Sequence, residues 1–305
     1  MPDHGRLRRR AAAKRLGEGA QEGASRAVLG RPRPEGALIV DDAPDGSVHP
    51  LVRLAQRFTI DWLDRADSAV PPQIMTPDYQ VHIGGIDLDG LEAYAPATLG
   101  QLTQFPGLLL TVHDLVTTGD RLAIHFSEHG ASARHELRTA TWNGVALFRW
   151  DGERLTENWT QEDYAARRRQ LADGRPDVVG SPMVAPWTVR PAGPDPAAED
   201  VVRRWLTGAA PGVDGVRWDD GRDGPLIGPD SAEVAEIFSA GDQVAFAATQ
   251  SGRLRGDASD AEGIPIPDDP VRLGLAGLVS VAGGAVTGGV VISDRLGLMR
   301  SLSRR

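Results

Sequence analysis

The strongest constraint on the fold comes from four consecutive stretches rich in apolar and β-branched residues, in which the side chains alternate in character. They occupy residues 108–116, 121–129, 138–149 and 153–160, directly after Phe105-Pro106-Gly107. Turn residues at 118–120 and 151–152 separate the first pair and the last pair, a spacing typical of antiparallel strands joined by tight turns. The apolar face of such a sheet has to be covered by helices or by a second sheet.

Helical patterns flank these strands. Residues 50–63 and 88–104 place apolar side chains at helical spacing, a short strand is expected at 80–83, and 162–172 predict a closing helix. The order helix, short strand, helix and then a run of strands predicts the α+β class. We expect the helices to pack on one face of a curved antiparallel sheet.

A second interval repeats this pattern weakly. Ala240-Gly241-Asp242 resembles Thr118-Gly119-Asp120, and at a constant offset of 131 residues Asp163 matches Asp294. Gly283-Gly284 divides two β-branched runs and predicts a buried hairpin. These matches indicate a tandem repeat, and chance similarity between two strand–turn patterns is the alternative.

The second copy is shorter than the first. The helix that contains Trp62 finds a partner in residues 201–206 around Trp205. Trp62 precedes Asp120 by 58 residues, whereas Trp205 precedes Asp242 by 37 residues. The second copy has therefore lost about 21 residues, which is enough for a helix or two short strands.

Composition divides the chain into four parts. Residues 1–46 are rich in Gly, Arg and Ala and are expected to be a disordered basic tail, with a targeting or binding arm as the alternative. Residues 173–197 contain six prolines and predict a linker between domains. The two domains are then 47–172 and 198–305.

Charge and cysteine content exclude several classes of protein. The chain has no cysteine, which excludes disulfides, thiolate nucleophiles and Cys-ligated metals. The net charge of −9 is concentrated after the basic head, and an acidic body repels phosphate backbones, so no nucleic-acid partner is expected. Neither a secretory signal nor a membrane span is predicted, which makes the cytoplasm the expected location.

Several short motifs occur in a fixed order between residues 50 and 172. They are Phe105-Pro106-Gly107, Val112-His113-Asp114-Leu115-Val116 with Gly119-Asp120-Arg121, the run Phe148 to Leu155, Glu157-Asn158-Trp159, Asp163, and Gln170-Leu171. In this order the interval resembles the SnoaL-like polyketide cyclase branch of the nuclear-transport-factor-2-like (NTF2-like) superfamily. The resemblance implies two tandem cone-shaped domains, each a cystatin-like α+β roll with a ligand pocket in its wide mouth. Members of the superfamily include cyclases, isomerases, dehydratases and non-catalytic binding modules.

Two positions depart from the pattern of the cyclases. Ser132 stands where the turn after the central strand usually carries a histidine. The next strand, residues 142–149, has no carboxylate, whereas cyclases of this branch carry an acid–base aspartate there.

Catalytic candidates follow from the alternation of side chains along the strands. On the central strand, Leu122, Ile124 and Phe126 form one face, and Ala123, His125, Ser127 and His129 form the other. His125 occupies a place where the family tends to carry arginine, and we expect it inside the pocket. His82 and Glu157 complete the predicted acid–base set, with a purely structural role as the alternative for each.

The ligand-binding residues are expected around these three side chains. They are Tyr79, Ser127, His129, Trp159, Phe58 and Trp62. His125, His129 and His135, together with Glu128 and Glu136, invite a metal site, but a strand places residues i and i+4 too far apart for easy chelation. No metal and no cofactor are therefore predicted.

Two functions remain open at this stage. The first is a cofactor-independent cyclase, isomerase or dehydratase that uses acid–base chemistry on a small hydrophobic carbonyl compound. The second is a non-catalytic module that binds a small molecule. In either case we expect the two domains to pack sheet against sheet within one chain, as an internal pseudo-dimer that is monomeric in solution.

Overall fold

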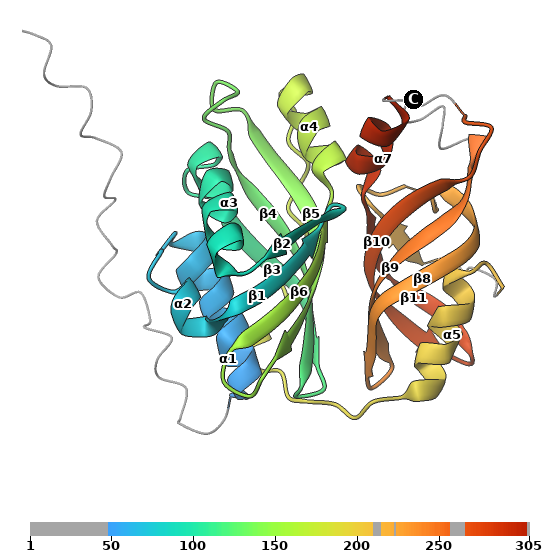
Figure 1. Cartoon of the computed structure of the whole chain (residues 1–305), viewed down its shortest axis with the longest axis horizontal. Helices are drawn as coiled ribbons and strands as arrows, with labels where there is room; N and C mark the ends of the chain where they lie inside the picture. The colour runs from blue at the N-terminus through green and yellow to red at the C-terminus, as the bar shows by residue number, and fades with distance from the viewer. Residues whose placement is uncertain (1–47, 210–214, 223, 257–265, 304–305) are drawn as a thin grey trace, which may run out of the picture. The chain divides into compact units, whose positions relative to one another are not determined.

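The computed structural model describes residues 48–209, 215–222, 224–256 and 266–303, so the predicted basic tail at 1–46 lies outside the described residues. Two β-sheets dominate this part of the chain (Figure 1). The first sheet has six strands in the order β2-β1-β6-β5-β4-β3, and the second has five in the order β7-β11-β10-β9-β8. The predicted α+β class, with two sheet-and-helix units, is confirmed.

The first sheet and its helices extend from residue 50 to residue 173. The helices are α1 (Pro50–Gln56), the π-helix η2 (Arg57–Asp64), α2 (Pro71–Ile74), α3 (Leu91–Gln104) and α4 (Tyr164–Asp173). The strands are β1 (Met75–Ile83), β2 (Ile86–Asp89), β3 (Leu109–Thr117), β4 (Arg121–Ala131), β5 (Thr139–Trp150) and β6 (Leu155–Glu162).

The second sheet begins after the connecting segment. Its elements are α5 (Pro196–Leu206), β7 (Val216–Trp218), β8 (Ile227–Ala240), β9 (Gln243–Leu254), β10 (Val271–Ala282), β11 (Ala285–Ser293) and α7 (Arg295–Leu302). The predicted hairpin at Gly283-Gly284 joins β10 to β11. None of the helices in the described part is long and apolar enough to cross a lipid bilayer.

Two predicted elements differ from the structure near Gly84-Gly85. The strand expected at 80–83 is the end of the longer β1, and the helix expected at 88–104 begins only after β2. Both glycines have positive φ angles, of 56° and 71°, which fold the chain into a tight hairpin that pairs β2 with β1. β1 also runs parallel to β6, so the sheet is mixed and not wholly antiparallel as predicted.

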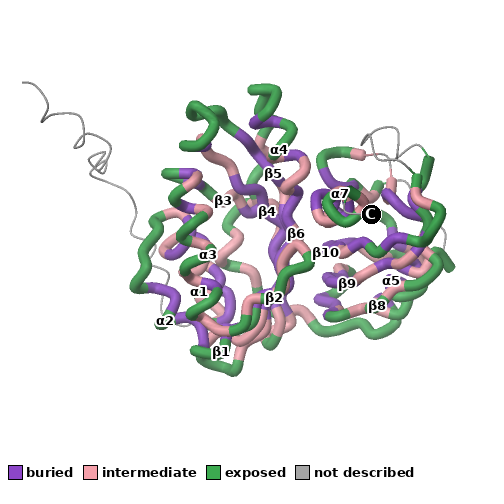
Figure 2. The backbone as a smooth tube through the Cα atoms, turned by 45° about the horizontal axis from the view of Figure 1, so that its top comes forward, coloured by how far each residue is buried: buried purple, intermediate pink, exposed green. Residues whose placement is uncertain are grey.

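One face of the first sheet packs against helices. α1, α2 and α3 lie together on this face (Figure 1). Buried side chains of these helices and of η2, among them Leu51 and Trp62, form a core with Ile124, Phe126 and Phe148 from the sheet. The central strands β4 and β5 are buried along most of their length (Figure 2).

The opposite face of the first sheet packs against the second sheet. Val116, Ala123, Val145, Leu147 and Trp159 from the first sheet form one buried apolar cluster with residues of the second. The residues contributed by the second sheet include Phe238, Ala245, Ala276, Leu278, Val290 and Ile292. Both faces of the first sheet are therefore covered.

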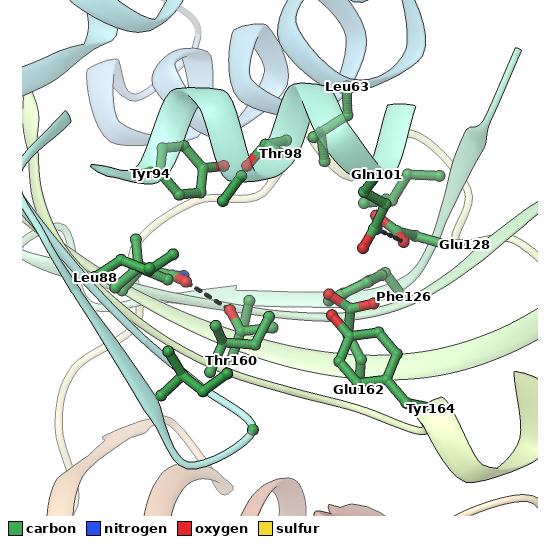
Figure 3. A pocket seen from close by; sticks show the side chains of 18 of the residues that line it. Leu63, Leu88, Tyr94, Thr98, Gln101, Phe126, Glu128, Thr160, Glu162 and Tyr164 are labelled. Carbon is green, nitrogen blue, oxygen red and sulfur yellow. Dashed lines mark hydrogen bonds between the residues drawn. The ribbon is translucent and has the colours of Figure 1, made fainter. Parts of the chain in front are cut away.

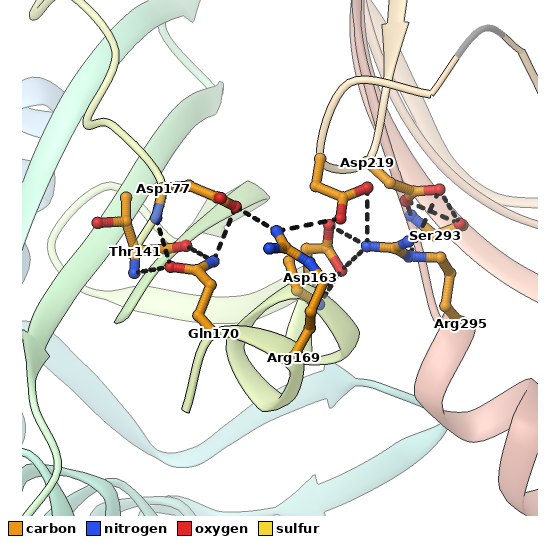
Figure 4. Close-up of polar contacts among 10 residues, drawn as sticks. Thr141, Asp163, Arg169, Gln170, Asp177, Asp219, Ser293 and Arg295 are labelled. Carbon is orange, nitrogen blue, oxygen red and sulfur yellow. Dashed lines mark hydrogen bonds and ion pairs between the residues drawn. The ribbon is translucent and has the colours of Figure 1, made fainter. Parts of the chain in front are cut away.

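A buried ion-pair network also joins the two sheets (Figure 4). The Arg295 guanidinium at the start of α7 donates to both carboxylate oxygens of Asp163 at 2.6 Å, and it lies 3.2 Å from Asp220 and 3.8 Å from Asp219. Asp163 is also the N-cap of α4, where it accepts a hydrogen bond from the Ala166 amide. Burial opposes the charge on Arg295, but attraction to Asp163 and Asp219 outweighs it and raises the Arg295 pKa.

The connecting segment 174–195 is held against β3, the edge strand of the first sheet. The amide of Met183 donates to the carbonyl of Val112, and the amide of Ala192 donates to that of Thr117. Trp187 packs on the core of the first sheet. A flexible linker was predicted here, but these contacts fix the segment along the strand, where it covers an otherwise open sheet edge.

The two sheets share details beyond their strand order. In each, a phenylalanine lies opposite a glycine of the next strand: Phe126 opposite Gly144, and Phe246 opposite Gly277. An added Cβ at either glycine would overlap the phenylalanine ring. β1 and β7 each pair in parallel with the last strand of their own sheet, and Asp163 and Asp294 cap the helices that follow.

We expect Gly144→Ala and Gly277→Ala to destabilise the protein by similar amounts, about 1–3 kcal/mol each, because each methyl group displaces a packed ring. Urea unfolding followed by tryptophan fluorescence measures the effect. Gly228→Ala is the matched control, because nothing lies within 4 Å of its added Cβ. Equal stability of all three variants would contradict the packing described here.

We expect Arg295→Met to cost about 3–5 kcal/mol of stability, because it leaves buried carboxylates without their cation. The loss should be smaller near pH 5, where these carboxyl groups protonate more readily. Arg300→Met, one turn later on the exposed side of the same helix, serves as the control. Urea unfolding at two pH values measures both variants, and an unchanged midpoint for Arg295→Met contradicts the expectation.

Candidate active site

A cavity of about 310 Å³ lies between α3 and the helix-covered face of the first sheet (Figure 3). Most of its wall is apolar. Phe58, Leu63, Ile124, Phe126 and Phe148 are among the residues that form it.

Two buried glutamates stand at one end of this cavity. Glu128 on β4 is 3% exposed, and Glu162 at the end of β6 is 7% exposed. Their carboxyl groups interact, and the interaction with Glu162 raises the pKa of Glu128. Glu128 Oε2 also accepts a hydrogen bond of 2.6 Å from the Gln101 amide, and Glu162 Oε2 accepts one of 2.7 Å from the Trp142 indole.

The two glutamates are expected to share one proton. Burial raises the pKa of Glu128 well above its ordinary value, and the neighbouring Glu162 raises it further. Burial also raises the pKa of Glu162, although hydrogen bonds from Trp142 and Tyr164 oppose this. Glu128 is therefore the protonated member and Glu162 the carboxylate, an arrangement suited to general acid–base chemistry.

A cation and a phenol support this charge distribution. The Arg167 guanidinium lies 4.3 Å from the Tyr164 ring centroid and 4.9 Å from that of Trp142, and it lowers the pKa of both glutamates. Burial raises the pKa of the Tyr164 hydroxyl well above 10, so this group stays a neutral donor to Glu162. The pair thus keeps one negative charge beside one positive charge.

The remaining polar groups of the cavity are paired with one another. Tyr94 accepts a hydrogen bond of 3.2 Å from the Trp62 indole and bonds to Thr98, while Thr160 donates to Asn158 at 2.6 Å. Burial raises the pKa of Tyr94 to about 12. These groups leave the glutamate pair as the reactive part of the wall.

The second half of the chain contributes to the cavity as well. Asp294, Leu296 and Arg300, from the start and the middle of α7, complete its lining. The neighbouring Arg295 is the cation bound by Asp163, so the same helix that joins the two sheets also closes this wall.

The predicted position of His125 is wrong. The cavity is lined by Ile124, Phe126 and Glu128, and strand alternation turns His125 to the opposite face, toward the second sheet. Ser127 lies on that face too, where it contacts His113 at 2.9 Å. His129 contacts Thr111 at 3.0 Å and does not line the cavity.

His82 and Glu157 are brought together, but also outside the cavity. His82 Nε2 lies 3.2 Å from Glu157, and its other ring nitrogen lies 2.7 Å from Asp87. The His82 ring stacks on Trp159, and this cluster faces the gap between the two sheets. A role in the interior chemistry of the cavity is therefore excluded for its members by position.

The other three of the four predicted aromatic residues have different outcomes. Phe58 lines the cavity as expected. Trp62 lies behind it, in the core, and reaches the cavity only through its hydrogen bond to Tyr94. Tyr79 is fully buried in the same core against the Tyr94 ring, and it does not line the cavity.

The sequence-based prediction missed both glutamates of the pair. On β4, Glu128 continues the face of Leu122, Ile124 and Phe126; on β6, Glu162 shares a face with Asn158 and Thr160. On β4 the available signal was a carboxylate that ends an apolar face, whereas the Glu162 face of β6 is polar and carries no such signal. The opposite parity was chosen on β4 because it held the histidines, and on β6 because it held Glu157 and Trp159.

Metal ligation finds no support among the side chains of the described ranges. No group of three or more His, Asp or Glu residues there is placed to hold a metal ion. Of the residues considered for such a site, His125 and Glu128 point to opposite faces of β4.

Comparison with known proteins identifies the first unit. Residues 53–171 match the family model described as SnoaL-like polyketide cyclase. These residues form a SnoaL-like domain. The second sheet lies outside the matched range, and no curated protein matches the chain.

Several solved structures are similar to about two fifths of the chain. A putative SnoaL-like polyketide cyclase from Jannaschia sp. CCS1 is 17% identical, covers 42% of this chain and 96% of its own, and has a TM-score of 0.39. IdmH, a putative polyketide cyclase from Streptomyces antibioticus, is 21% identical over 39% of this chain and 96% of its own (TM-score 0.36). AclR, a putative hydroxylase from Streptomyces galilaeus, is 19% identical over 40% and 94% (TM-score 0.36).

The positions that depart from the cyclase pattern now have a structural account. Ser132 is fully buried, and its hydroxyl contacts His135 at 2.9 Å, so it supports the turn after β4. On β5, Ala146 and Phe148 face the cavity of the SnoaL-like domain without a carboxylate. Its acidic groups come from the neighbouring strands β4 and β6 instead.

We expect unequal losses of stability from replacing the two glutamates by glutamine. Glu128→Gln keeps a donor toward Glu162 and an acceptor toward Gln101, so it should fold with little loss. Glu162→Gln places an amide donor among existing donors and should cost about 1–3 kcal/mol. Urea unfolding measures both, and an equal loss from the two variants contradicts the assignment of the proton.

The pH dependence of stability gives a separate test. Because the Glu128 pKa is raised in the folded protein, protonation of Glu128 stabilises the fold. This stabilisation is complete below the ordinary pKa of 4.5 and is lost as the pH rises through the pKa of Glu128 in the folded protein. As the pH rises above 4.5, the native protein should therefore lose stability relative to Glu128→Gln. Parallel curves for the two proteins would contradict the raised pKa.

Proposed function

We propose that this chain is a cofactor-independent acid–base catalyst that moves protons on a small, largely hydrophobic carbonyl compound. The single observation that supports this most is the Glu128–Glu162 pair, buried in an apolar cavity and held by donors that favour one shared proton. Reactions of this kind include cyclisation, isomerisation and dehydration.

The two glutamates have complementary roles in the proposed step. The Glu162 carboxylate takes a proton from the carbon next to the carbonyl, and the electron pair of that C–H bond forms the carbon–carbon double bond of an enol. The carbonyl oxygen takes the proton of Glu128 at the same time. The pair keeps its single negative charge, and returning the protons to other atoms of the ligand restores both groups.

The environment of Glu162 fits the role of base. Burial raises its pKa, which makes it a stronger base than a solvated carboxylate. Arg167 and the hydrogen bonds from Trp142 and Tyr164 keep it ionised and oriented. A carboxylate that accepts many hydrogen bonds is a weak base, because these bonds lower its pKa. At Glu162, burial raises the pKa and opposes this effect.

The substrate class follows from the size and polarity of the cavity. A volume of about 310 Å³ accommodates a ligand of one or two rings, and the aromatic and aliphatic wall favours an apolar body. Polar recognition is concentrated at the glutamate end, where one carbonyl group would lie. Arg300 at the α7 side is the only cation in this lining, within the part of the chain that the structure describes.

A non-catalytic binding module is the second candidate. The observation that favours it is the absence of a carboxylate on the cavity face of β5, the strand that carries the acid–base aspartate in the cyclase pattern. Such a module would use the glutamate pair only to bind the ligand.

Proton exchange in D₂O distinguishes the two candidates. With 2-tetralone as probe, we expect the native protein to accelerate exchange of the hydrogens next to the carbonyl, measured by ¹H NMR. Glu162→Gln should lower this rate by about 10²–10⁴-fold, the usual contribution of a general base. Glu128→Gln should also slow exchange while it retains binding of the probe.

Glu153→Gln, in the exposed turn between β5 and β6, is the control and should exchange at the native rate. Binding of 2-tetralone without exchange above that of buffer would instead support the binding module. Equal rates in the native protein and in Glu162→Gln would refute the proposed base.

We also propose that residues 198–303 are a degenerate second copy of the fold that serves the first as a built-in partner. The shared strand order, the two Phe–Gly pairs and the two capping aspartates support this. The chain would then need no second copy of itself to cover the outer face of its first sheet.

A further inference from the structure

A second cavity, of about 330 Å³, lies between the two sheets, on the opposite side of β4 from the glutamate pair. Strands of both sheets and the connecting segment supply its wall. The side chains that line it are mostly polar: His113, Asp114, His125, Asn143, Gln243 and Ser280. Leu278 and Val290 add one apolar side. It is therefore a different chemical environment from the cavity between α3 and the sheet.

The most informative group in this cavity is His125. Its side chain is 5% exposed, and its Nε2 atom is buried with no hydrogen-bond partner. The neighbouring Asn143 side chain interacts with the ring and opposes, in part, the lowering of the His125 pKa by burial. A buried nitrogen without a partner is destabilising unless water or a ligand supplies the missing bond.

His113 beside it cannot supply that bond. The two rings lie 4.9 Å apart, but the Nδ1–H of His113 donates to the carbonyl of Ser181 at 2.9 Å. Its Nε2 is engaged by the Ser127 hydroxyl, also at 2.9 Å. Both nitrogens of His113 are thus occupied, and His125, whose Nε2 has no partner, is among the residues that line the cavity.

The charges around the cavity define what else a ligand must carry. Arg217 on β7 is the only cation among the described lining residues, and it is exposed, with no ion pair recorded in the described ranges. Asp114 is the only anion, and it accepts a hydrogen bond from the Leu115 amide. One carboxylate can therefore pair with the guanidinium of Arg217, whereas Asp114 disfavours a second negative charge.

We propose that this cavity is a binding site for a small hydroxycarboxylate with an aliphatic side chain. The ligand's carboxylate pairs with Arg217 at the open side, and its hydroxyl donates to the unpaired Nε2 of His125. The aliphatic part contacts Leu278 and Val290. Because burial, His113 and Arg217 lower the pKa of His125 to about 3, its ring stays neutral and accepts this hydrogen bond at physiological pH.

Ligand titrations followed by NMR test the proposal on the full chain, with 2-hydroxyisovalerate as the probe. We expect saturable binding in the range of about 0.1–10 mM, which is usual for a ligand of this size. Isovalerate, which lacks the hydroxyl, and 2-hydroxyisovaleramide, which lacks the carboxylate, should each bind at least about tenfold more weakly.

Two variants connect the binding to the named residues. Arg217→Gln, at an exposed position, and His125→Phe, which keeps the ring but removes its nitrogens, should each weaken binding of 2-hydroxyisovalerate by about tenfold or more. Arg203→Gln, on the exposed face of α5, is the charge-matched control and should bind as the native protein does. Unchanged binding of 2-tetralone by His125→Phe verifies that the fold is intact.

Three outcomes would overturn the proposal. The first is the absence of saturable binding of 2-hydroxyisovalerate to the native protein. The second is equal binding of the acid, its amide and isovalerate, which would mean that neither group is recognised. The third is an equal loss in Arg203→Gln and Arg217→Gln, which would indicate a general effect of charge. Glu128→Gln should leave this binding unchanged, so failure here is separable from failure of the proposed catalysis.

Discussion

Burial of the first sheet on both faces is the constraint on which the rest of the structure depends. A sheet with one solvated face needs only one apolar set of side chains, but β4, β5 and β6 have to satisfy two different neighbours at once. On β4, for example, the even-numbered residues face the helices and the cavity, and the odd-numbered residues face the second sheet. Each strand therefore carries two functions that are separated only by the alternation of its side chains.

This constraint explains why polar residues are found on both faces. Glu128 and His125 are three residues apart on β4, yet one is directed to the interior cavity and the other to the cavity between the sheets. Neither could be exchanged for the other by a small motion, because a shift of one residue would turn every side chain of the strand to the wrong face. The two sites are consequently fixed relative to one another by the strand itself.

The sequence predicted the elements better than it predicted their faces. Strand positions from β3 to β6 were within a few residues of the structure, because Gly119-Asp120 and Asp151-Gly152 fix the turns. Alternation also divided β4 correctly into two sets of side chains. It could not tell which set is turned toward the helices, since residues of both sets are buried.

The choice between the faces needed information that lies far away in the sequence. His125 stands opposite the second sheet, whose strands begin about a hundred residues later, and nothing local to β4 records that contact. The partners of Glu128 also come from other elements: Gln101 lies on α3 and Glu162 on β6. Buried polar residues are placed by such long-range partners, whereas turns and helix caps are placed by their neighbours.

The second sheet shows what the glutamate pair requires. Counted from the two Phe–Gly pairs, Ala248 stands where the first sheet has Glu128; counted from the two capping aspartates, Ser293 stands where the first sheet has Glu162. Between α5 and the second sheet, Trp205, Trp218 and Phe246 pack against one another.

The absence of an acidic pair from the second sheet agrees with the aromatic rings that fill the space beside it. A carboxylate without partners or solvent is costly to bury, whereas an apolar core is stabilised when its space is filled. Beside the first sheet, Gln101 on α3 and Arg167 on α4 keep the glutamates paired or neutralised. Among the described elements, the second sheet has no counterpart of α3, and so it lacks the helix that would supply the first of these partners. Without such a helix, a buried glutamate pair beside the second sheet would lack a hydrogen-bond partner, which accounts for the absence of the pair there.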